Sequence, residues 1–198
     1  MTVIWSNRGD IDCELLENMW SSIPNVRVVE ITPELYDFEE EVDSAISEEE
    51  DTLILTGHGT TEGLLFPDYS LGAYIIHENN FGLIRAKNVF CCWCYASSFC
   101  YRFDRSSFCS SMFISNEAEA VFNSCPGYTQ TQIDEVNIKF YKEVNRLLVD
   151  NIPVSGWMKP LLSSIDHYNL VDSFNRSGLT WLPTVVEPSD RIKRLSCF

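Results

Sequence analysis

The sequence predicts one α/β domain built on a mostly parallel sheet of about five or six strands. Short apolar runs typical of strands alternate with amphipathic helical segments, a pattern that places helices on both faces of such a sheet. The run at residues 89–93 has no polar alternation, as expected of a central strand that is covered on both faces. At 198 residues, 45% of them hydrophobic, the chain is large enough to bury a single substantial core.

The expected strands are apolar runs rich in β-branched residues, at residues 2–5, 26–31, 52–56, 89–93, 112–115 and 179–182. Two shorter runs, at 64–66 and 71–76, are separated by Pro67 and Asp68 and should form a hairpin beside the main sheet. The polar and aromatic stretch at 97–111 has no clear period, and we expect it to be a long surface loop.

The expected helices have apolar residues at helical spacing, and they cover residues 10–21, 33–46, 81–86, 129–149, 154–162 and 165–174. Asp10 should cap the first helix, and Pro33 should occupy the first position of the second. Residues 1–150 are the predicted core of the domain. Residues 151–198 are a predicted C-terminal helical extension, which ends in a basic tail at 191–194.

Composition narrows the classes of function. A formal net charge of −15 argues against nucleic-acid binding, because phosphates would be repelled. No apolar run approaches the roughly 20 residues of a membrane span, and the N-terminus has no signal-peptide pattern, so we expect a cytoplasmic protein. The eight cysteines do not demand a disulfide scaffold in a chain of this size, and a cytosol would keep them reduced.

The candidate catalytic residues follow the ends of two predicted strands. The strand at 52–56 leads into His58, and the strand at 89–93 leads into Cys94. Parallel strands present their carboxyl ends at the same edge of a sheet, where active sites of α/β folds lie. A cysteine thiolate can attack a carbonyl carbon, a neighbouring histidine can protonate the leaving amine, and backbone N–H groups can stabilise the oxyanion. The sequence therefore predicts a Cys–His dyad.

The residues around this dyad have expected roles of their own. Gly57 and Gly59 should leave room for a substrate backbone beside the imidazole, and the N–H groups of Gly59 and Cys94 are the expected oxyanion donors. Strand alternation places Cys92 on the same face as Cys94 but deeper, in the core. Taken singly, His58 also fits a capping or core histidine and Cys94 a buried core cysteine; their pairing favours function.

A strand ending in His-Gly, a small hairpin and a strand ending in Cys before small residues resemble the caspase-like cysteine peptidases. That group includes caspases, legumain, gingipain, clostripain and separase, and the chain looks nearest to the bacterial CHAT-like branch. The resemblance implies a caspase-like three-layer sandwich, His58 as acid/base, Cys94 as nucleophile and Gly59 in the oxyanion hole. It also implies a protein or peptide substrate and no cofactor. Trp93 and Tyr95 flank the cysteine here, whereas the caspase signature has Gln-Ala before the cysteine and a Gly that follows it.

The resemblance also places the primary specificity pocket near the two catalytic strands and the loop that follows. An acidic residue there would select Arg or Lys, and a basic one would select Asp. The acidic candidates for substrate binding are Asp104, Glu117 and Glu119, and the basic ones are Arg102 and Arg105. Each also fits an ordinary surface charge. The acidity of the whole chain leads us to expect cleavage after a basic residue.

Two alternatives and one regulatory hypothesis stay open. Cys91, Cys94, Cys100 and Cys109 supply thiols for a metal, but there is no second C-x-x-C knuckle and strand alternation separates Cys91 from Cys94, so no metal is expected. The same fold could instead be a non-catalytic assembly module in a signalling or defence complex. A regulatory protein partner fits either class. The loop expected at 97–111 would border the site and gate it.

Overall fold

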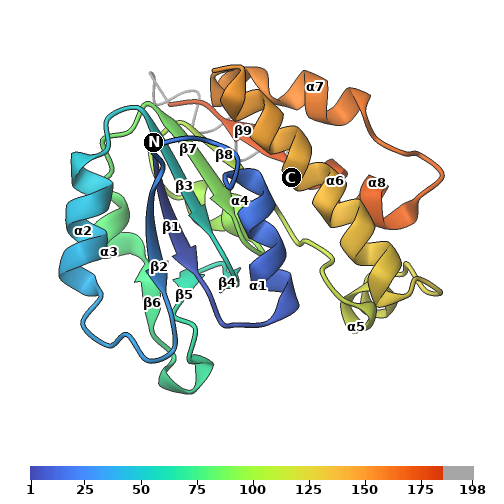
Figure 1. The fold of residues 1–198 in the computed structure, drawn as a ribbon, viewed down its shortest axis with the longest axis horizontal. Helices are drawn as coiled ribbons and strands as arrows, with labels where there is room; N and C mark the ends of the chain where they lie inside the picture. The colour runs from blue at the N-terminus through green and yellow to red at the C-terminus, as the bar shows by residue number, and fades with distance from the viewer. Residues whose placement is uncertain (185–198) are drawn as a thin grey trace.

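A six-stranded sheet in the order β2-β1-β3-β7-β8-β9 forms the centre of the computed structural model, which describes residues 1–184 (Figure 1). Its strands are β1 (Thr2–Ser6), β2 (Arg27–Ile31), β3 (Thr52–Thr56), β7 (Asn88–Cys92), β8 (Ser107–Cys109) and β9 (Thr180–Leu182). The first five strands run parallel, and β9 pairs antiparallel with β8. The predicted α/β class with a mostly parallel sheet is confirmed.

Helices cover both faces of the sheet and give three layers (Figure 1). One face packs against α2 (Glu39–Glu48), α3 (Glu78–Phe81) and α4 (Ala96–Cys100). The other face packs against α1 (Ile11–Leu15) and the long α6 (Gln130–Val149). The remaining helical segments are α5 (Glu117–Phe122), α7 (Met158–Ser163), α8 (Leu170–Ser177) and the short 3₁₀ turns η1 (Leu16–Met19), η2 (Tyr69–Leu71) and η3 (Val154–Gly156).

Side chains of the central strand β7 alternate between two hydrophobic clusters. Cys91 belongs to the cluster under α2 and α4, whereas Phe90 and Cys92 belong to the cluster under η1 and α6. This alternation is the period of two that a strand imposes, and here both faces are buried. The predicted central strand is therefore confirmed, as is the placement of Cys92 in the core.

A second, three-stranded sheet lies beside the carboxyl ends of the main strands (Figure 1). It consists of β4 (Gly59–Thr60), β5 (Gly63–Leu65) and β6 (Tyr74–Ile76), all antiparallel. The predicted hairpin is confirmed, with β4 as an added strand that begins directly after His58. The chain therefore passes from β3 through His58 into this small sheet.

The surface loop predicted at 97–111 and the strand predicted at 112–115 were wrong. The segment instead contains α4 and the fifth main strand, β8, whose three residues are all fully buried. Serines made this stretch resemble a loop, but their polar groups are satisfied inside the protein. Ser110 donates its hydroxyl to Trp93 O at 2.8 Å, and Cys109 donates its thiol to Ser107 Oγ at 3.4 Å.

Helix starts also differ from the predictions in three places. The second helix begins at Glu39 and not at Pro33, because the backbone first turns with the Leu35 N–H donating to Thr32 O. The third covers Glu78–Phe81 and not 81–86, because His77 and Asn80 form a capping box in front of it. The helix expected at 165–174 is Leu170–Ser177. The helix predicted at 129–149 is confirmed, capped by Thr129.

The C-terminal region is joined to the core by a strand and by a buried ion-pair network. β9 lengthens the main sheet, and Arg176 on α8 is fully buried between Asp172, at 2.5 Å, and Glu143 of α6, at 2.5 Å. Removing one member of such a network leaves an uncompensated buried charge. The predicted basic tail at 191–194 lies outside the described residues. Within residues 1–184, no helix is long and apolar enough to cross a lipid bilayer.

Replacing Trp157 with alanine should destabilise the fold by about 3–5 kcal/mol, because a large buried aromatic leaves a cavity. Trp157 is fully buried, packs edge-on against Phe90 and Phe108, and donates its indole N–H to Ile152 O at 2.8 Å. Urea unfolding measures the change. Tyr168 is 99% exposed and provides the control, because Tyr168→Ala should stay within about 0.5 kcal/mol of wild type. Equal effects of the two substitutions would contradict the packing described.

Candidate active site

A small pocket opens at the carboxyl ends of β3 and β7. The residues that line it come from the ends of these strands, from α1, η1 and α6, and from the segment after β8: Asp12, Cys13, Leu16, Gly57, His58, Cys92, Trp93, Cys94, Phe113, Ser115 and Tyr141. His58 and Cys94, predicted separately from two strand ends, therefore line the same pocket. Such an edge is where open α/β sheets bind ligands.

A carboxylate that the sequence analysis did not pair with His58 holds its ring. His58 Nε2 lies 3.2 Å from Asp10 Oδ2, and the ring meets Tyr69 edge-on at a centroid distance of 5.8 Å. The other oxygen of Asp10 accepts the Cys13 N–H at 2.9 Å, so Asp10 also caps α1 as predicted. One carboxylate thus fixes both the helix start and the imidazole.

The environment of Asp10 favours its charged form. Partial burial raises the pKa of the Asp10 carboxyl, but the Cys13 N–H and the neighbouring His58 outweigh it, and the pKa falls below its ordinary value. An ionised Asp10 can accept the ring N–H of His58. That hydrogen bond would leave the other ring nitrogen as the one that can exchange a proton with a reacting group.

Cys94 sits at a sharp turn between β7 and α4. The next residue, Tyr95, has a left-handed backbone with φ of 67°, which is uncommon for a residue other than glycine. Backbone strain of this kind gathers at functional sites. The half-buried thiol of Cys94 points towards Phe113 and donates to Phe113 O at 3.7 Å.

The thiol of Cys94 is protonated at neutral pH in this arrangement. Burial raises the pKa of the Cys94 thiol to about 11, and the nearby carboxylates of Glu119 and Asp12 add to the rise. A reactive cysteine needs the opposite, a thiolate stabilised by a neighbouring cation. The structure therefore contains a resting site in which the thiol interacts with a carbonyl oxygen.

The two predicted oxyanion donors are both backbone groups without a backbone acceptor. Gly59 is paired with Leu64 in the β4–β5 ladder. The Leu65 N–H donates to His58 O, so the ladder's hydrogen bonds come from the residues on either side of this pair and not from the pair itself. By the alternation of an antiparallel ladder, the Gly59 N–H points away from β5. Across residues 1–184, the Cys94 N–H also donates no hydrogen bond.

Close packing explains the glycines on either side of His58. A Cβ on Gly59 would lie 2.1 Å from Trp93 Cδ1, and one on Gly57 would lie 2.6 Å from Ser6 Cβ. Trp93 packs over Gly59 and donates its indole N–H to Thr60 O at 3.2 Å. Gly57 also has a φ of 140°, which side chains rarely adopt. That these glycines leave room for a substrate backbone stays a prediction.

The three acidic candidates for substrate binding lie in different places. Glu119 is nearest the pocket, because its Oε2 accepts the N–H and hydroxyl of the pocket residue Ser115 at 2.8 and 3.0 Å. Glu117 accepts the Gln130 N–H at the start of α6. Asp104 lies between α4 and the amino end of β8. Neither Glu117 nor Asp104 lines the pocket.

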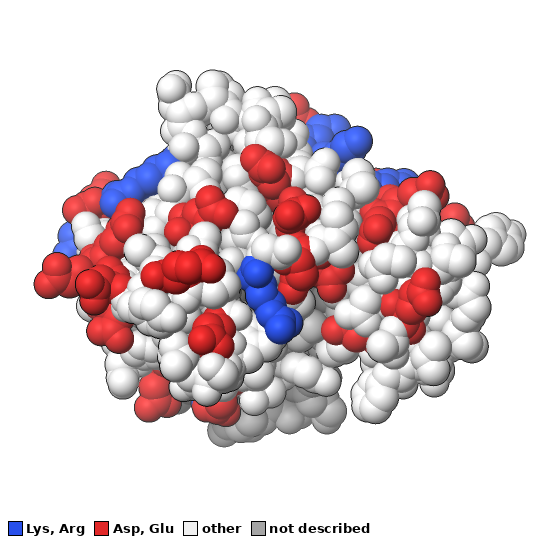
Figure 2. Space-filling model, turned by 60° about the horizontal axis from the view of Figure 1, so that its bottom comes forward, with Lys and Arg blue, Asp and Glu red and all other residues white. Residues whose placement is uncertain are grey.

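Asp12, which the sequence analysis did not select, is the carboxylate that lines the pocket directly. The Ser115 hydroxyl lies 2.7 Å from Asp12 Oδ2, so Asp12, Ser115 and Glu119 form one polar wall. Burial raises the pKa of Asp12 above its ordinary value. Figure 2 turns the molecule so that the bottom of Figure 1 comes forward, and acidic side chains predominate on the face that it shows. In the sequence, only its position two residues after Asp10 could have pointed to Asp12 as a pocket residue.

Two pocket residues and the neighbouring Asp10 form a group that could hold a metal ion. Asp10, Cys13 and His58 bring one ligand atom each to within 4.8 Å of one another. The C-x-x-C pair considered from sequence is not such a site, because Cys91 and Cys94 belong to opposite faces of the sheet. The sulfur atom of Cys91 instead lies within 4.8 Å of those of Cys100 and Cys109.

The chain matches no protein-family model, no curated protein and no solved structure.

Alkylation of Cys94 should be slow at pH 8 and should accelerate steeply towards pH 11. A thiol with a pKa of about 11 has roughly a hundredfold less thiolate at pH 8 than an ordinary cysteine. Iodoacetamide labelling, followed by peptide mass mapping at each pH, measures the rate at this one site. Fast labelling at pH 7, with a plateau below pH 9, would contradict the resting arrangement described.

Proposed function

We propose that this protein is a cysteine endopeptidase in which Cys94 is the nucleophile and His58 the acid/base. The observation that carries the proposal is that His58 and Cys94 line one pocket at the ends of adjacent parallel strands. The thiolate of Cys94 would attack a peptide carbonyl, and His58 would protonate the leaving amine. Water would then hydrolyse the acyl-enzyme with the same histidine acting as base.

Asp10 and two backbone N–H groups complete the proposed mechanism. Asp10, 3.2 Å from His58 Nε2, would hold the ring and stabilise its protonated form, which makes it a positioning residue. The N–H groups of Gly59 and Cys94 would donate hydrogen bonds to the oxyanion of the tetrahedral intermediate. Donors of this kind contribute roughly a hundred- to a thousandfold in turnover. The proposed chemistry needs no cofactor, and the reduced state of its thiol suits a cytoplasmic location.

The proposed enzyme rests in a latent state. Its thiol has a pKa of about 11 and contacts Phe113 O, so activation requires Cys94 to leave that carbonyl and approach His58. The predicted gate at 97–111 does not suit this role, because much of it is the buried α4 and β8. The segment that holds the thiol is 113–115. Binding of a substrate or a regulatory protein against it would be the trigger.

We further propose that a basic residue precedes the cleaved bond. Asp12 lines the pocket, and Ser115 links it to Glu119, so the wall beside Cys94 is acidic. A half-buried carboxylate pair of this kind would be stabilised by a guanidinium or ammonium group. Asp12 replaces Asp104 and Glu117 as the residue that we expect to recognise this group.

Turnover of fluorogenic peptides with Arg, Lys, Asp or Leu before the cleaved bond tests the peptidase proposal. We expect hydrolysis of the Arg and Lys peptides. Cys94→Ala and His58→Ala should lower kcat/KM to background, and Asp10→Asn should lower kcat by roughly a hundred- to ten-thousandfold. Cys125→Ala is the matched control, because Cys125 lies in a separate cluster under α5, and it should retain full activity. Activity that survives Cys94→Ala would overturn the assignment.

Asp12→Asn should raise KM for Arg peptides while leaving kcat for a Leu peptide nearly unchanged, because it removes a charge and not a reacting group. The loss of one ion pair in a partly buried pocket predicts roughly a ten- to hundredfold change in kcat/KM. Glu117→Gln is the control on the same acidic face, away from the pocket. An equal loss on Arg and Leu peptides would mean that Asp12 does not select the substrate.

A non-catalytic assembly module is the second candidate. The raised pKa of Cys94 favours it, because an unreactive thiol is what such a module would have. Two measurements separate these functions: binding of candidate partners, and peptide hydrolysis with and without each partner. A module would bind its partner equally well with Cys94→Ala and would never hydrolyse a peptide.

A further inference from the structure

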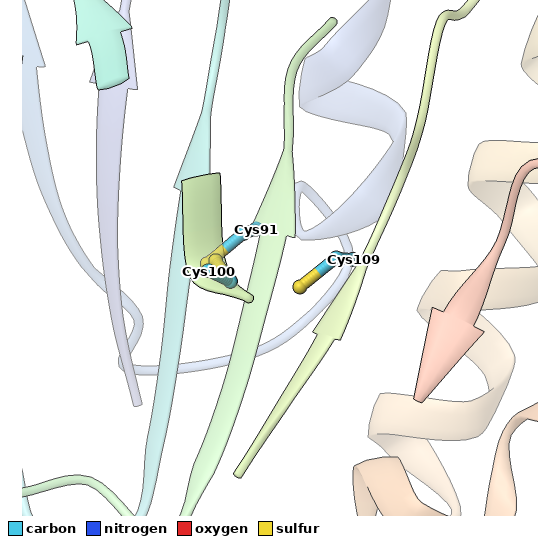
Figure 3. A group of neighbouring side chains, drawn as sticks. All are labelled: Cys91, Cys100 and Cys109. Atoms are coloured by element: carbon cyan, nitrogen blue, oxygen red, sulfur yellow. The ribbon is translucent and has the colours of Figure 1, made fainter. Parts of the chain in front are cut away.

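Three cysteine sulfur atoms converge in the core, away from the candidate active site. They belong to Cys91 of β7, Cys100 of α4 and Cys109 of β8, and they all lie within 4.8 Å of one another (Figure 3). All three residues are completely buried. They share the hydrophobic cluster beneath α2 and α4, on the sheet face opposite Cys94.

The backbone fixes this convergence. Cys91 and Cys109 are register partners in the parallel β7–β8 ladder, so their side chains point to the same face at the same level. Cys100 is the last residue of α4, which lies over that face. The three positions come from three elements, and the arrangement does not depend on a flexible loop.

The surroundings offer one oxygen and one positive charge. The thiol of Cys109 lies 3.4 Å from Ser107 Oγ, which is itself fully buried. The Arg105 guanidinium donates hydrogen bonds to Ala86 O, at 3.0 Å, and to Ile84 O. Burial lowers the pKa of Arg105, whereas the charge of a Cys91 thiolate would raise it, so the two side chains interact electrostatically.

We propose that Cys91, Cys100 and Cys109 bind a thiophilic divalent metal ion, with Zn²⁺ as the occupant. Zinc–sulfur bonds of about 2.3 Å around a tetrahedral ion put the sulfurs roughly 3.8 Å apart. The sulfurs therefore need to shift by less than about 1 Å to meet that geometry. Ser107 Oγ, 3.4 Å from Cys109 Sγ, is the oxygen that we assign to the fourth position.

Charge selects a divalent ion over a monovalent one. Three thiolates and Zn²⁺ leave one negative charge, which the half-buried Arg105 guanidinium would offset through its electrostatic interaction with Cys91. A monovalent ion such as Cu⁺ would leave a second, uncompensated negative charge in an apolar environment, which is costly. Thiolate ligands otherwise suit both ions.

Binding replaces protons with the metal. In the unfolded chain, which is the state that takes up the ion, the three cysteines are ordinary thiols. They release three protons as one Zn²⁺ takes their place on the sulfur atoms, so affinity rises with pH. The site is closed to solvent, and the ion must enter while the core is open, during folding. Once bound, it would connect β7, the strand that leads into Cys94, to β8 and α4, whether or not the protein is a peptidase.

The test is to unfold the full chain in guanidinium with a thiol-free reductant and refold it anaerobically with Zn²⁺. We expect one zinc per chain after desalting, measured by atomic emission, and three protons released per zinc at neutral pH. Co²⁺ in place of Zn²⁺ should give the intense sulfur-to-metal charge-transfer absorption of several thiolates. Cys91→Ala and Cys109→Ala should each lose the metal, whereas Cys125→Ala should keep it.

His58→Ala separates this site from the Asp10, Cys13 and His58 group in the pocket. Zinc retained in His58→Ala and lost in Cys109→Ala supports the core site. Trace zinc in the refolded wild type, no charge-transfer absorption with Co²⁺, or zinc that depends on His58 would overturn it. If a cysteine variant fails to fold, the proton count and the Co²⁺ spectrum of the wild type decide the question alone.

Discussion

The parallel pairing of β3 with β7 is the constraint on which the site depends. Its register places Thr56 opposite Cys92, and the Gly57 N–H donates to Cys92 O at 3.3 Å. His58 and Cys94 each lie two residues beyond that pair, so both leave the sheet at the same level. A slip of one residue in a strand would turn its side chains to the other face. Both strands are buried on both faces, which prevents such a slip.

Around that register, each neighbouring element stabilises the resting state. α1 presents Asp10 to His58, and the segment after β8 presents Phe113 O to Cys94. Burial raises the pKa of the Cys94 thiol, and the charges of Glu119 and Asp12 add to the rise, although these charges would also attract a cationic group. Negative charge beside a cysteine therefore has two consequences. It suppresses the free thiolate, and a bound cation would relieve that suppression.

The sequence predicted the parts of the fold that local patterns determine and missed those that depend on distant contacts. Apolar runs located β3 and β7, and hence His58 and Cys94. β8 was mistaken for a loop because its serines find partners only in the folded core. Asp10 was identified as a helix cap, but its contact with His58 joins residues that are far apart in the chain. The cysteines were considered as metal ligands and set aside, because only the β7–β8 register, which the sequence does not reveal, brings Cys91 beside Cys109.

The central claim is that His58 and Cys94 act together in one pocket. Its most direct test is covalent trapping with an arginyl acyloxymethyl ketone, with the modified residue located by peptide mass mapping. The account predicts a single adduct on Cys94 that forms in the wild-type protein and is strongly slowed in His58→Ala. An adduct on another cysteine, or equal labelling of Cys94 with and without His58, would contradict it.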